Sequence, residues 1–178
     1  MIILLTGPPG IGKTTAIMKA VEALKARKGL KIGGMITREV REGGKRVGFQ
    51  IVDLVNNRTG WLAHINQPEG PKISKYRVNL RDLEEIGVKA LEDAIKEADL
   101  IICDEIGPME LISKKFREVV KKLANSGKPV LGTIHYKLSE SLIEELKECP
   151  HLKVIKMTFT NRDFIPFLLF KEVSKLVK

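Results

Sequence analysis

Eight residues near the start of the chain have the types and the spacing of a phosphate-binding loop. Residues 7 to 14 read GPPGIGKT, which matches the pattern G-x-x-x-x-G-K-[ST] of the P-loop, also called the Walker A motif. The glycines permit a tight turn whose backbone N–H groups converge on an anion, and the following helix adds a favourable dipole. Lys13 supplies a positive charge to the β- and γ-phosphates, and the Thr14 hydroxyl suits Mg²⁺. We therefore predict that nine residues bind a nucleotide here: Gly7, Pro8, Pro9, Gly10, Ile11, Gly12, Lys13, Thr14 and Thr15.

Two acidic residues follow an apolar run in the middle of the chain. Residues 100 to 103 read LIIC, which predicts a buried strand, and Asp104 and Glu105 come directly after it. A P-loop protein needs a carboxylate at the end of a neighbouring strand to orient the magnesium ion, as in the Walker B motif. We predict that Thr14 and Asp104 hold the metal. We also predict that Lys13 and Glu105 are catalytic, with Glu105 polarising an attacking water as general base.

The destination of the phosphate is the question that the P-loop leaves open. The Asp104–Glu105 pair favours water as the acceptor, and hence hydrolysis of a nucleoside triphosphate. A nucleotide or small-molecule kinase and a nucleic-acid-stimulated ATPase switch are the alternatives. The sequence lacks an evident arginine cluster for an acceptor phosphate and has no obvious arginine finger, although Arg38 and Arg46 flank a predicted hairpin. The absence of a finger fits slow hydrolysis, because a well-placed one raises the rate by roughly 10³ to 10⁵.

Apolar runs that alternate with helical periods predict an α/β fold with a mostly parallel central sheet flanked by helices. This is the architecture of a P-loop NTPase core of the RecA-like or nucleotide-kinase-like type. The predicted strands of this sheet are residues 2–6, 30–37, 99–104, 129–134 and 152–159. The predicted helices run from residue 13 to the stop at Gly29, over 83–95, over 116–123, within 141–150, and from 163 onward.

Residues 38 to 80 do not show this alternation of strand and helix patterns. Gly43 and Gly44 predict a two-residue hairpin turn, and further turn-forming clusters at residues 56–60 and 67–71 separate short apolar segments. We therefore predict an antiparallel, hairpin-rich β insertion within a single domain that spans residues 1–178.

Composition limits the class of protein. The chain has 178 residues, of which 43% are hydrophobic and 30% charged, as in a globular protein. No apolar run approaches the ~18 residues of a membrane span, and the chain start lacks a basic leader, so we expect a cytoplasmic protein without membrane contact. Cys103 and Cys149 have no metal or redox spacing, and we interpret Cys103 as a small buried side chain.

The formal net charge of +9 suggests a nucleic-acid surface at first sight. The basic residues are nevertheless scattered and interleaved with glutamate, a pattern that also fits a thermophilic, heat-adapted surface. We therefore expect nucleoside triphosphates as the partners and a monomer as the working form, with nucleic acid as the weaker interpretation.

The order of several motifs resembles one known family. Besides the P-loop, these motifs are Gly48-Phe49 with Ile51-Val52-Asp53, then Leu62-Ala63, the segment DEIGPMEL at residues 104–111, and Asn161-Arg162-Asp163. Together they resemble the small nucleoside-triphosphatase family of thermophilic prokaryotes, whose animal relative is called cancer-related nucleoside-triphosphatase. The resemblance covers essentially the whole chain, and DEIGPMEL is its most specific part.

The resemblance implies slow, Mg²⁺-dependent hydrolysis of ATP, GTP and other nucleoside triphosphates, with low base selectivity. It also implies that the strand-end segment from Ile101 to Pro108 contacts the nucleotide, which adds Gly107 to the expected site. Asn161 and Arg162 would lie near the base. Their position between the last strand and the last helix agrees with this, and an arginine tolerates different bases because it stacks on their faces. Helix capping by Asn161 or Asp163 is the alternative.

Overall fold

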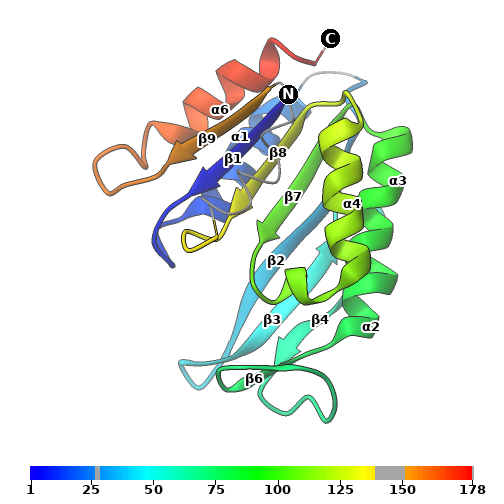
Figure 1. The fold of residues 1–178 in the computed structure, drawn as a ribbon. Coiled ribbons are helices and arrows are strands. Elements are labelled where there is room, and N and C mark those ends of the chain that lie inside the picture. The colour runs from blue at the N-terminus through cyan, green and yellow to red at the C-terminus, as the bar shows by residue number, and fades with distance from the viewer. Residues whose placement is uncertain (27–28, 139–150, 178) are drawn as a thin grey trace.

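A single nine-stranded sheet organises the molecule. The computed structural model describes residues 1–26, 29–138 and 151–177. Within these residues the strand order is β5-β6-β4-β3-β2-β7-β8-β1-β9. The strands are β1 (Ile2–Thr6), β2 (Ile32–Glu42), β3 (Lys45–Asp53), β4 (Thr59–His64), β5 (Lys72–Ile73), β6 (Tyr76–Val78), β7 (Leu100–Ile106), β8 (Val130–Ile134) and β9 (Leu152–Lys156) (Figure 1).

The five strands β2, β7, β8, β1 and β9 form the parallel half of the sheet. Helices cover both of its faces, which explains why β1, β7 and β8 are apolar almost without interruption. Cys103 lies fully buried in β7 as an unpaired thiol, as predicted, and Cys149 lies outside the described residues. The predicted α/β fold with a mostly parallel sheet is confirmed.

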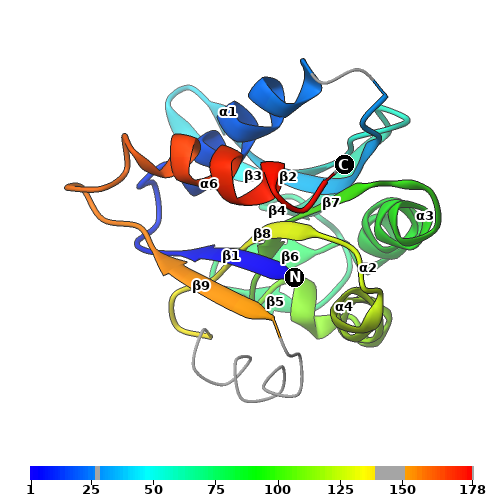
Figure 2. The same cartoon turned by 90° about the horizontal axis from the view of Figure 1, so that it is seen from above.

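The flanking helices bury one apolar face each. On one side of the sheet lie α1 (Lys13–Lys25) and α6 (Ile165–Ser174), and on the other lie α3 (Lys89–Glu97) and α4 (Lys114–Asn125) (Figure 2). Helix α4 begins where the hydroxyl of Ser113 accepts a hydrogen bond from the backbone N–H of Phe116, at 3.1 Å. None of the described helices is long and apolar enough to cross a membrane.

The helix predicted over residues 83–95 is divided into three segments. It starts as the single turn α2 (Leu80–Asp82), continues as the π-helical segment η1 (Leu83–Val88), and ends as α3. Asn79 caps the first turn, because its side-chain oxygen accepts a hydrogen bond from the backbone N–H of Asp82 at 3.0 Å. The prediction missed this start because Asn79 and Leu80 were assigned to the preceding strand.

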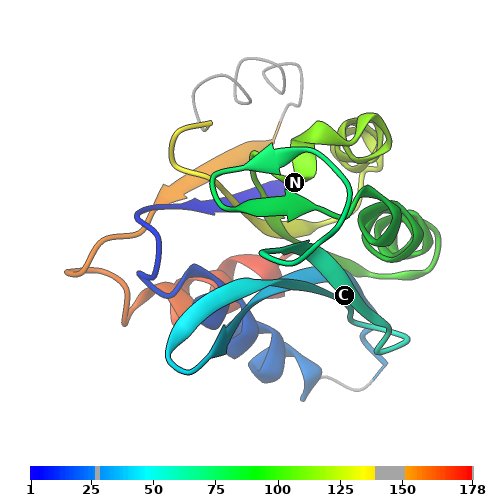
Figure 3. The same cartoon turned by 90° about the horizontal axis from the view of Figure 1, so that it is seen from below.

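The antiparallel strands are an extension of the same sheet. The first half of β2 pairs in parallel with β7, whereas from Met35 onward β2 pairs antiparallel with β3, and β4, β6 and β5 follow. Gly43 and Gly44 form the predicted two-residue turn, both with positive φ. Figure 3 shows the molecule from the end at which this hairpin lies. Because β2 belongs to both halves, the hairpin is anchored directly in the core.

The segment after β9 differs in detail from its prediction. The strand ends at Lys156 instead of residue 159, and the last helix begins at Ile165 instead of residue 163. A loop with its own hydrogen bonds fills the interval between them, so its apolar residues do not continue the strand. The helix predicted within residues 141–150 lies outside the described residues.

Gly34 lies where β2 approaches β7 so closely that a side chain cannot fit. Its φ is +114°, and an added Cβ would collide with the carbonyl oxygen of Ile102. Gly34→Ala should therefore lower the free energy of unfolding by about 3 kcal/mol or more, measured by urea denaturation. Gly127→Ala is the matched control, since φ there is +70° with open space around the added atom. It should lose only about 1–2 kcal/mol. Equal losses in both variants would contradict a steric constraint at Gly34.

Candidate active site

The P-loop connects β1 to α1 at the carboxyl edge of the parallel strands, as predicted. Gly10 and Gly12 have φ values of +75° and +102°, a conformation that glycine adopts without strain, and Gly12 is the residue that precedes α1. A Cβ on Gly7 would lie 2.7 Å from the carbonyl oxygen of Met157, so the loop packs tightly against the segment after β9. The Lys13 ammonium lies over the loop, where Nζ donates to the Gly7 carbonyl at 3.1 Å.

Asp104 lies at the end of β7 and is fully buried. Its Oδ1 accepts a hydrogen bond from the hydroxyl of Thr133 on the neighbouring strand β8, whereas Oδ2 has no hydrogen-bond partner of good geometry among the described residues. Burial raises the pKa of Asp104, and the hydroxyls of Thr133 and Thr14 together with the charge of Lys13 act in the opposite direction. The structure thus brings Thr14, Lys13 and Asp104 together, as predicted.

Glu105 reaches a cavity of about 290 Å³ beside the P-loop. It is lined by Pro9 and Lys13 of the P-loop, by Gly107 and His135, and by residues of the β insertion. Burial raises the pKa of Glu105 to about 6, Lys13 opposes this rise, and Asp104 adds to it. The carboxyl group is therefore mostly ionised at pH 7 while lying in a partly desolvated site, which suits a general base.

A second cavity, of about 340 Å³, lies on the other side of the P-loop. It is lined by Gly10, Ile11, Gly12, Thr15, Ala16, Lys19, Met157, Arg162, Asp163 and Pro166. The Arg162 guanidinium lies 5.5 Å from the centre of the Phe159 ring, which is 74% exposed. The guanidinium also lies 3.8 Å from Asp163 Oδ1, and Arg162 and Asp163 both line the cavity.

Three matches place the chain among known proteins. A family model described as NTPase matches residues 2–170. The chain belongs to the NTPase family. It is 47% identical to nucleoside-triphosphatase THEP1 of Thermofilum pendens, over 98% of this chain and 96% of the relative. It is 48% identical to the protein of the same name from Methanocaldococcus jannaschii, over 97% and 95% of the two chains.

Solved structures of the NTPase family agree with this assignment. The crystal structure of THEP1 from the hyperthermophile Aquifex aeolicus superposes with a TM-score of 0.83 at 34% identity, covering 100% of both chains. The solution structure of a human cancer-related nucleoside triphosphatase gives 0.80 at 33% identity, covering 99% of this chain and 98% of that one. The resemblance inferred from the motifs and the enzyme class expected from them, a nucleoside-triphosphate hydrolase, are thus confirmed.

Asn161 lies outside both cavities of this NTPase, unlike its neighbour Arg162. Its Oδ1 accepts a hydrogen bond from the backbone N–H of Thr158 at 2.8 Å, and its Nδ2 donates to the carbonyl of Lys156 at 2.9 Å. The side chain of Asn161 therefore stabilises the loop between β9 and α6 through hydrogen bonds to the backbone at Thr158 and Lys156. The alternative of helix capping by Asn161 or Asp163 is wrong, since α6 has no side-chain cap, whereas contact of Asn161 with the base stays a prediction.

The sequence analysis missed Glu110. This residue is 4% exposed, lies in the short 3₁₀ turn η2 (Glu110–Ile112), and lines the same cavity as Lys13 and Glu105. A Cβ on Gly107 would lie 2.8 Å from Glu110 Oε2, which explains the glycine at that position. The detectable signal was an acidic residue inside the apolar tail of DEIGPMEL, where burial of a carboxyl group is unusual.

The remaining polar candidates lie around the cavity without forming an arginine finger. Arg46 lines it, but its Nε donates to the Tyr76 hydroxyl at 2.8 Å and its Nη1 to Glu39 Oε2 at 3.0 Å. His135 also lines it, and burial lowers its pKa, an effect that the charges of Lys13 and Lys137 increase. Both residues thus line the same cavity as Lys13 and Glu105, and the Arg46 guanidinium is already hydrogen-bonded to Tyr76 and Glu39.

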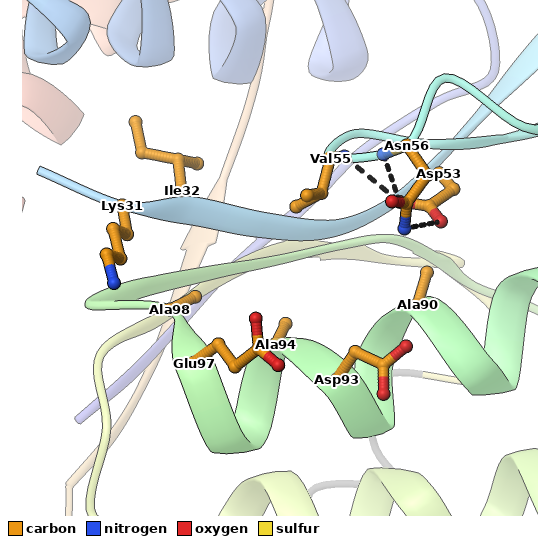
Figure 4. Close-up of a pocket in the computed structure, with 10 residues that line it drawn as sticks. All are labelled: Lys31, Ile32, Asp53, Val55, Asn56, Ala90, Asp93, Ala94, Glu97 and Ala98. Carbon is orange, nitrogen blue, oxygen red and sulfur yellow. Dashed lines mark hydrogen bonds between the residues drawn. The ribbon is translucent and has the colours of Figure 1, made fainter.

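A further cavity, of about 390 Å³, lies away from the P-loop, between the start of β2, the end of β3 and helix α3 (Figure 4). The carboxylates of Asp53, Asp93 and Glu97 line it together with alanines, and Asp53 accepts hydrogen bonds from the backbone N–H groups of Val55 and Asn56. This surplus of negative charge opposes the binding of a triphosphate, and none of the predicted site residues lies there.

Asn161→Ala should loosen the loop that carries Arg162, because both side-chain hydrogen bonds are lost. We expect faster amide hydrogen exchange at Thr158, whose N–H loses its acceptor, with a local loss of about 1 kcal/mol. Asn161→Asp keeps the acceptor and should give an intermediate rate. Asn125→Ala, on the exposed end of α4, serves as the control with unchanged exchange at Thr158. Unchanged exchange in Asn161→Ala would contradict the anchoring role.

Proposed function

We propose that the chain hydrolyses nucleoside triphosphates with Mg²⁺ to the diphosphate and phosphate, slowly and with broad base specificity. One observation carries the proposal. The P-loop lysine, a fully buried aspartate with a free oxygen, and a partly buried glutamate meet at the same end of the sheet. The first two groups suit a metal-bound triphosphate, and the third suits the activation of water.

The triphosphate would lie along the P-loop, between the two cavities. The backbone N–H groups of Gly7, Gly10, Ile11 and Gly12 and the start of α1 offer a positive potential to the phosphates. Lys13 would exchange its contacts with the loop carbonyls for contacts with the β- and γ-phosphates, since an ammonium group binds phosphate oxygen more strongly than a neutral carbonyl.

The residues around Asp104 fit a magnesium ion. The free Oδ2 is a buried acceptor that needs a partner, and the Thr14 hydroxyl lies beside the same carboxylate. The described residues hold no group of three or more His, Cys, Asp or Glu that would bind a metal without substrate. This donor set suits Mg²⁺, which is typically held by one or two protein oxygens together with phosphates and waters. When bound, the ion would neutralise charge on the β- and γ-phosphates.

Glu105 would take the proton of the attacking water. The water oxygen forms a bond to the γ-phosphorus while the bond from that phosphorus to the bridging oxygen breaks, which leaves the nucleoside diphosphate and phosphate. Lys13 stabilises the charge on the phosphate oxygens during this step. Arg46 is held by Tyr76 and Glu39, so we expect no arginine-finger contribution and therefore slow turnover.

The nucleobase would occupy the 340 Å³ cavity against the guanidinium of Arg162. Stacking on a guanidinium uses the π-face that all bases share, which supports broad specificity. The relatives reported above are named as nucleoside-triphosphatases and not as kinases, so hydrolysis is preferred to the kinase alternative. A single domain, a monomeric state, a cytoplasmic location and the absence of nucleic-acid binding stay predictions.

Glu105→Gln should lower kcat by about 10² to 10⁴, because the amide cannot accept the proton of water. Nucleotide binding should change by no more than about threefold, since the P-loop is untouched. Phosphate release and binding of a fluorescent ATP analogue measure the two effects. Glu22→Gln, on the exposed face of α1, is the matched control with wild-type values. Full turnover in Glu105→Gln would remove this residue from the mechanism.

Arg162→Ala should raise KM for ATP and CTP by about tenfold at nearly constant kcat, because a stacking contact to the base is lost. Phe159→Ala should raise KM for ATP and KM for CTP about threefold, because the guanidinium of Arg162 then loses the ring on which it packs. Hydrolysis of inorganic triphosphate, which has no base, should be unaffected in both variants. Phe167→Ala is the control, as this ring is 58% exposed and lies outside the cavity. An equal rise of KM for inorganic triphosphate would show that Arg162 acts on the phosphates instead.

A further inference from the structure

Glu110 is a buried carboxyl group that the mechanism above does not use. It is 4% exposed, and the described residues provide no ion pair for it. Its carboxyl group accepts hydrogen bonds from the backbone N–H groups of Gly107 and of Glu110 itself. A buried ionised carboxylate without a cation is strongly unfavourable, so such groups are expected to be neutral or to serve a function.

Glu110 and Glu105 flank the same glycine. A Cβ on Gly107 would lie 2.8 Å from Glu110 Oε2 and 3.5 Å from Glu105 Oε1, so both carboxyl groups border the small space beside this glycine. The backbone of Gly107 also accepts a hydrogen bond from the N–H of Leu111 at 3.0 Å, which closes the turn after β7. The position of Glu105 therefore depends on the turn that Glu110 fastens.

We propose that Glu110 is a positioning residue that works as an uncharged carboxylic acid, fastening the turn after β7 so that the Glu105 carboxylate faces the attacking water. The proposal rests on the proposed function, because it takes Glu105 to be the general base. Anchoring of the turn requires only hydrogen bonds to backbone N–H groups. The neutral form of the acid provides them without a second negative charge in the cavity.

The electrostatic surroundings agree with a neutral Glu110. Burial raises its pKa to about 8, and the nearby charges of Glu105 and Asp104 add to the rise, whereas the hydrogen bonds from the backbone N–H groups of Glu110 and Gly107 oppose it without cancelling it. The cations that line the same cavity are Lys13 from the P-loop and Arg46 from β3, together with the titratable His135 after β8. Lys13 favours the ionised form of Glu105, whereas Arg46 is already paired with Glu39. At neutral pH the two glutamates therefore differ in charge, the arrangement by which carboxyl pairs divide their roles.

The pH dependence follows from this difference. Above pH 8 Glu110 loses its proton, and two like charges then face each other across Gly107, which displaces Glu105 and lowers kcat. The free energy of unfolding, like kcat, decreases as the pH rises. Since the pKa in the folded state exceeds that in the unfolded state, the native state gains most from this proton below pH 4.5 and loses that gain as pH rises through 8.

The test compares Glu110→Gln and Glu110→Ala with the wild type, with Glu118→Gln on the exposed face of α4 as the matched control. Glu110→Gln has the same shape and no charge, so kcat at pH 7 should stay within about threefold of the wild type and should no longer fall above pH 8. Glu110→Ala should lose more than about tenfold in kcat while KM for ATP changes less than about twofold. The part of the stability loss between pH 4.5 and 8 that comes from Glu110 should disappear in Glu110→Gln, whereas the parts that come from Asp104 and Glu105 should stay.

Three results would overturn the proposal. The first is a Glu110→Gln variant as inactive as Glu105→Gln, which would require the charge of Glu110. The second is wild-type kcat in Glu110→Ala. The third is a wild-type profile that stays flat above pH 8. If Glu110→Ala does not fold, the dependence of kcat on pH in Glu110→Gln and in the wild type still tests the proposal. Failure of the proposed function is recognised separately, by full turnover in Glu105→Gln.

Discussion

The rest of the site depends on the burial of the Asp104 carboxylate. It has no contact with solvent, only one of its oxygens is hydrogen-bonded, and in a low-dielectric interior an ionised group in this state is unfavourable. The compensating groups come from separate elements: Thr133 from β8, and Lys13 and Thr14 from the P-loop and α1. Strands β1, β7 and β8 must therefore end at the same level, which the parallel register provides. Under the proposed function, a divalent cation of the bound polyphosphate would be the partner that the second oxygen of Asp104 lacks.

The continuity of β2 explains how the antiparallel extension comes to line the cavity beside Glu105. One strand pairs with β7 in the parallel core and with β3 in the antiparallel extension, so the hairpin is part of the core sheet. Leu62 and Ile73 of this extension line the same cavity as Glu105. An apolar wall of this kind lowers the local dielectric and strengthens the interactions of the charged groups opposite it.

The sequence was most informative where a local pattern decides the structure. The P-loop, the apolar strand before Asp104 and the Gly43–Gly44 turn were predictable, because each depends on neighbouring residues only. Glu110 and Asn161 were not, since their roles come from contacts with the folded chain. The sequence does not show that the Glu110 side chain is buried. It also does not show whether the Asn161 amide binds a ligand or the backbone of its own loop. The strand order was likewise undetermined, because continuous apolar runs specify burial and not neighbours.

The three carboxyl groups of DEIGPMEL differ in function because their surroundings differ. Asp104 is fully buried beside a lysine and two hydroxyls, which favour its charge and leave one oxygen for a cation. Glu105 is partly buried, with a pKa raised to about 6, and so combines basicity with ionisation at neutral pH. Glu110 is fully buried near the charges of Glu105 and Asp104, and its pKa is raised to about 8, which favours the neutral acid at pH 7. Under the proposals above, eight residues of one strand and turn would provide a metal ligand, a base and an uncharged anchor, and the greater burial of Glu110 separates the last two. Under the proposed function, the base and the metal ligand would be in place before substrate arrives, while the Arg46 guanidinium is hydrogen-bonded to Tyr76 and Glu39. The rate would then be limited by the transition-state charge that no arginine neutralises.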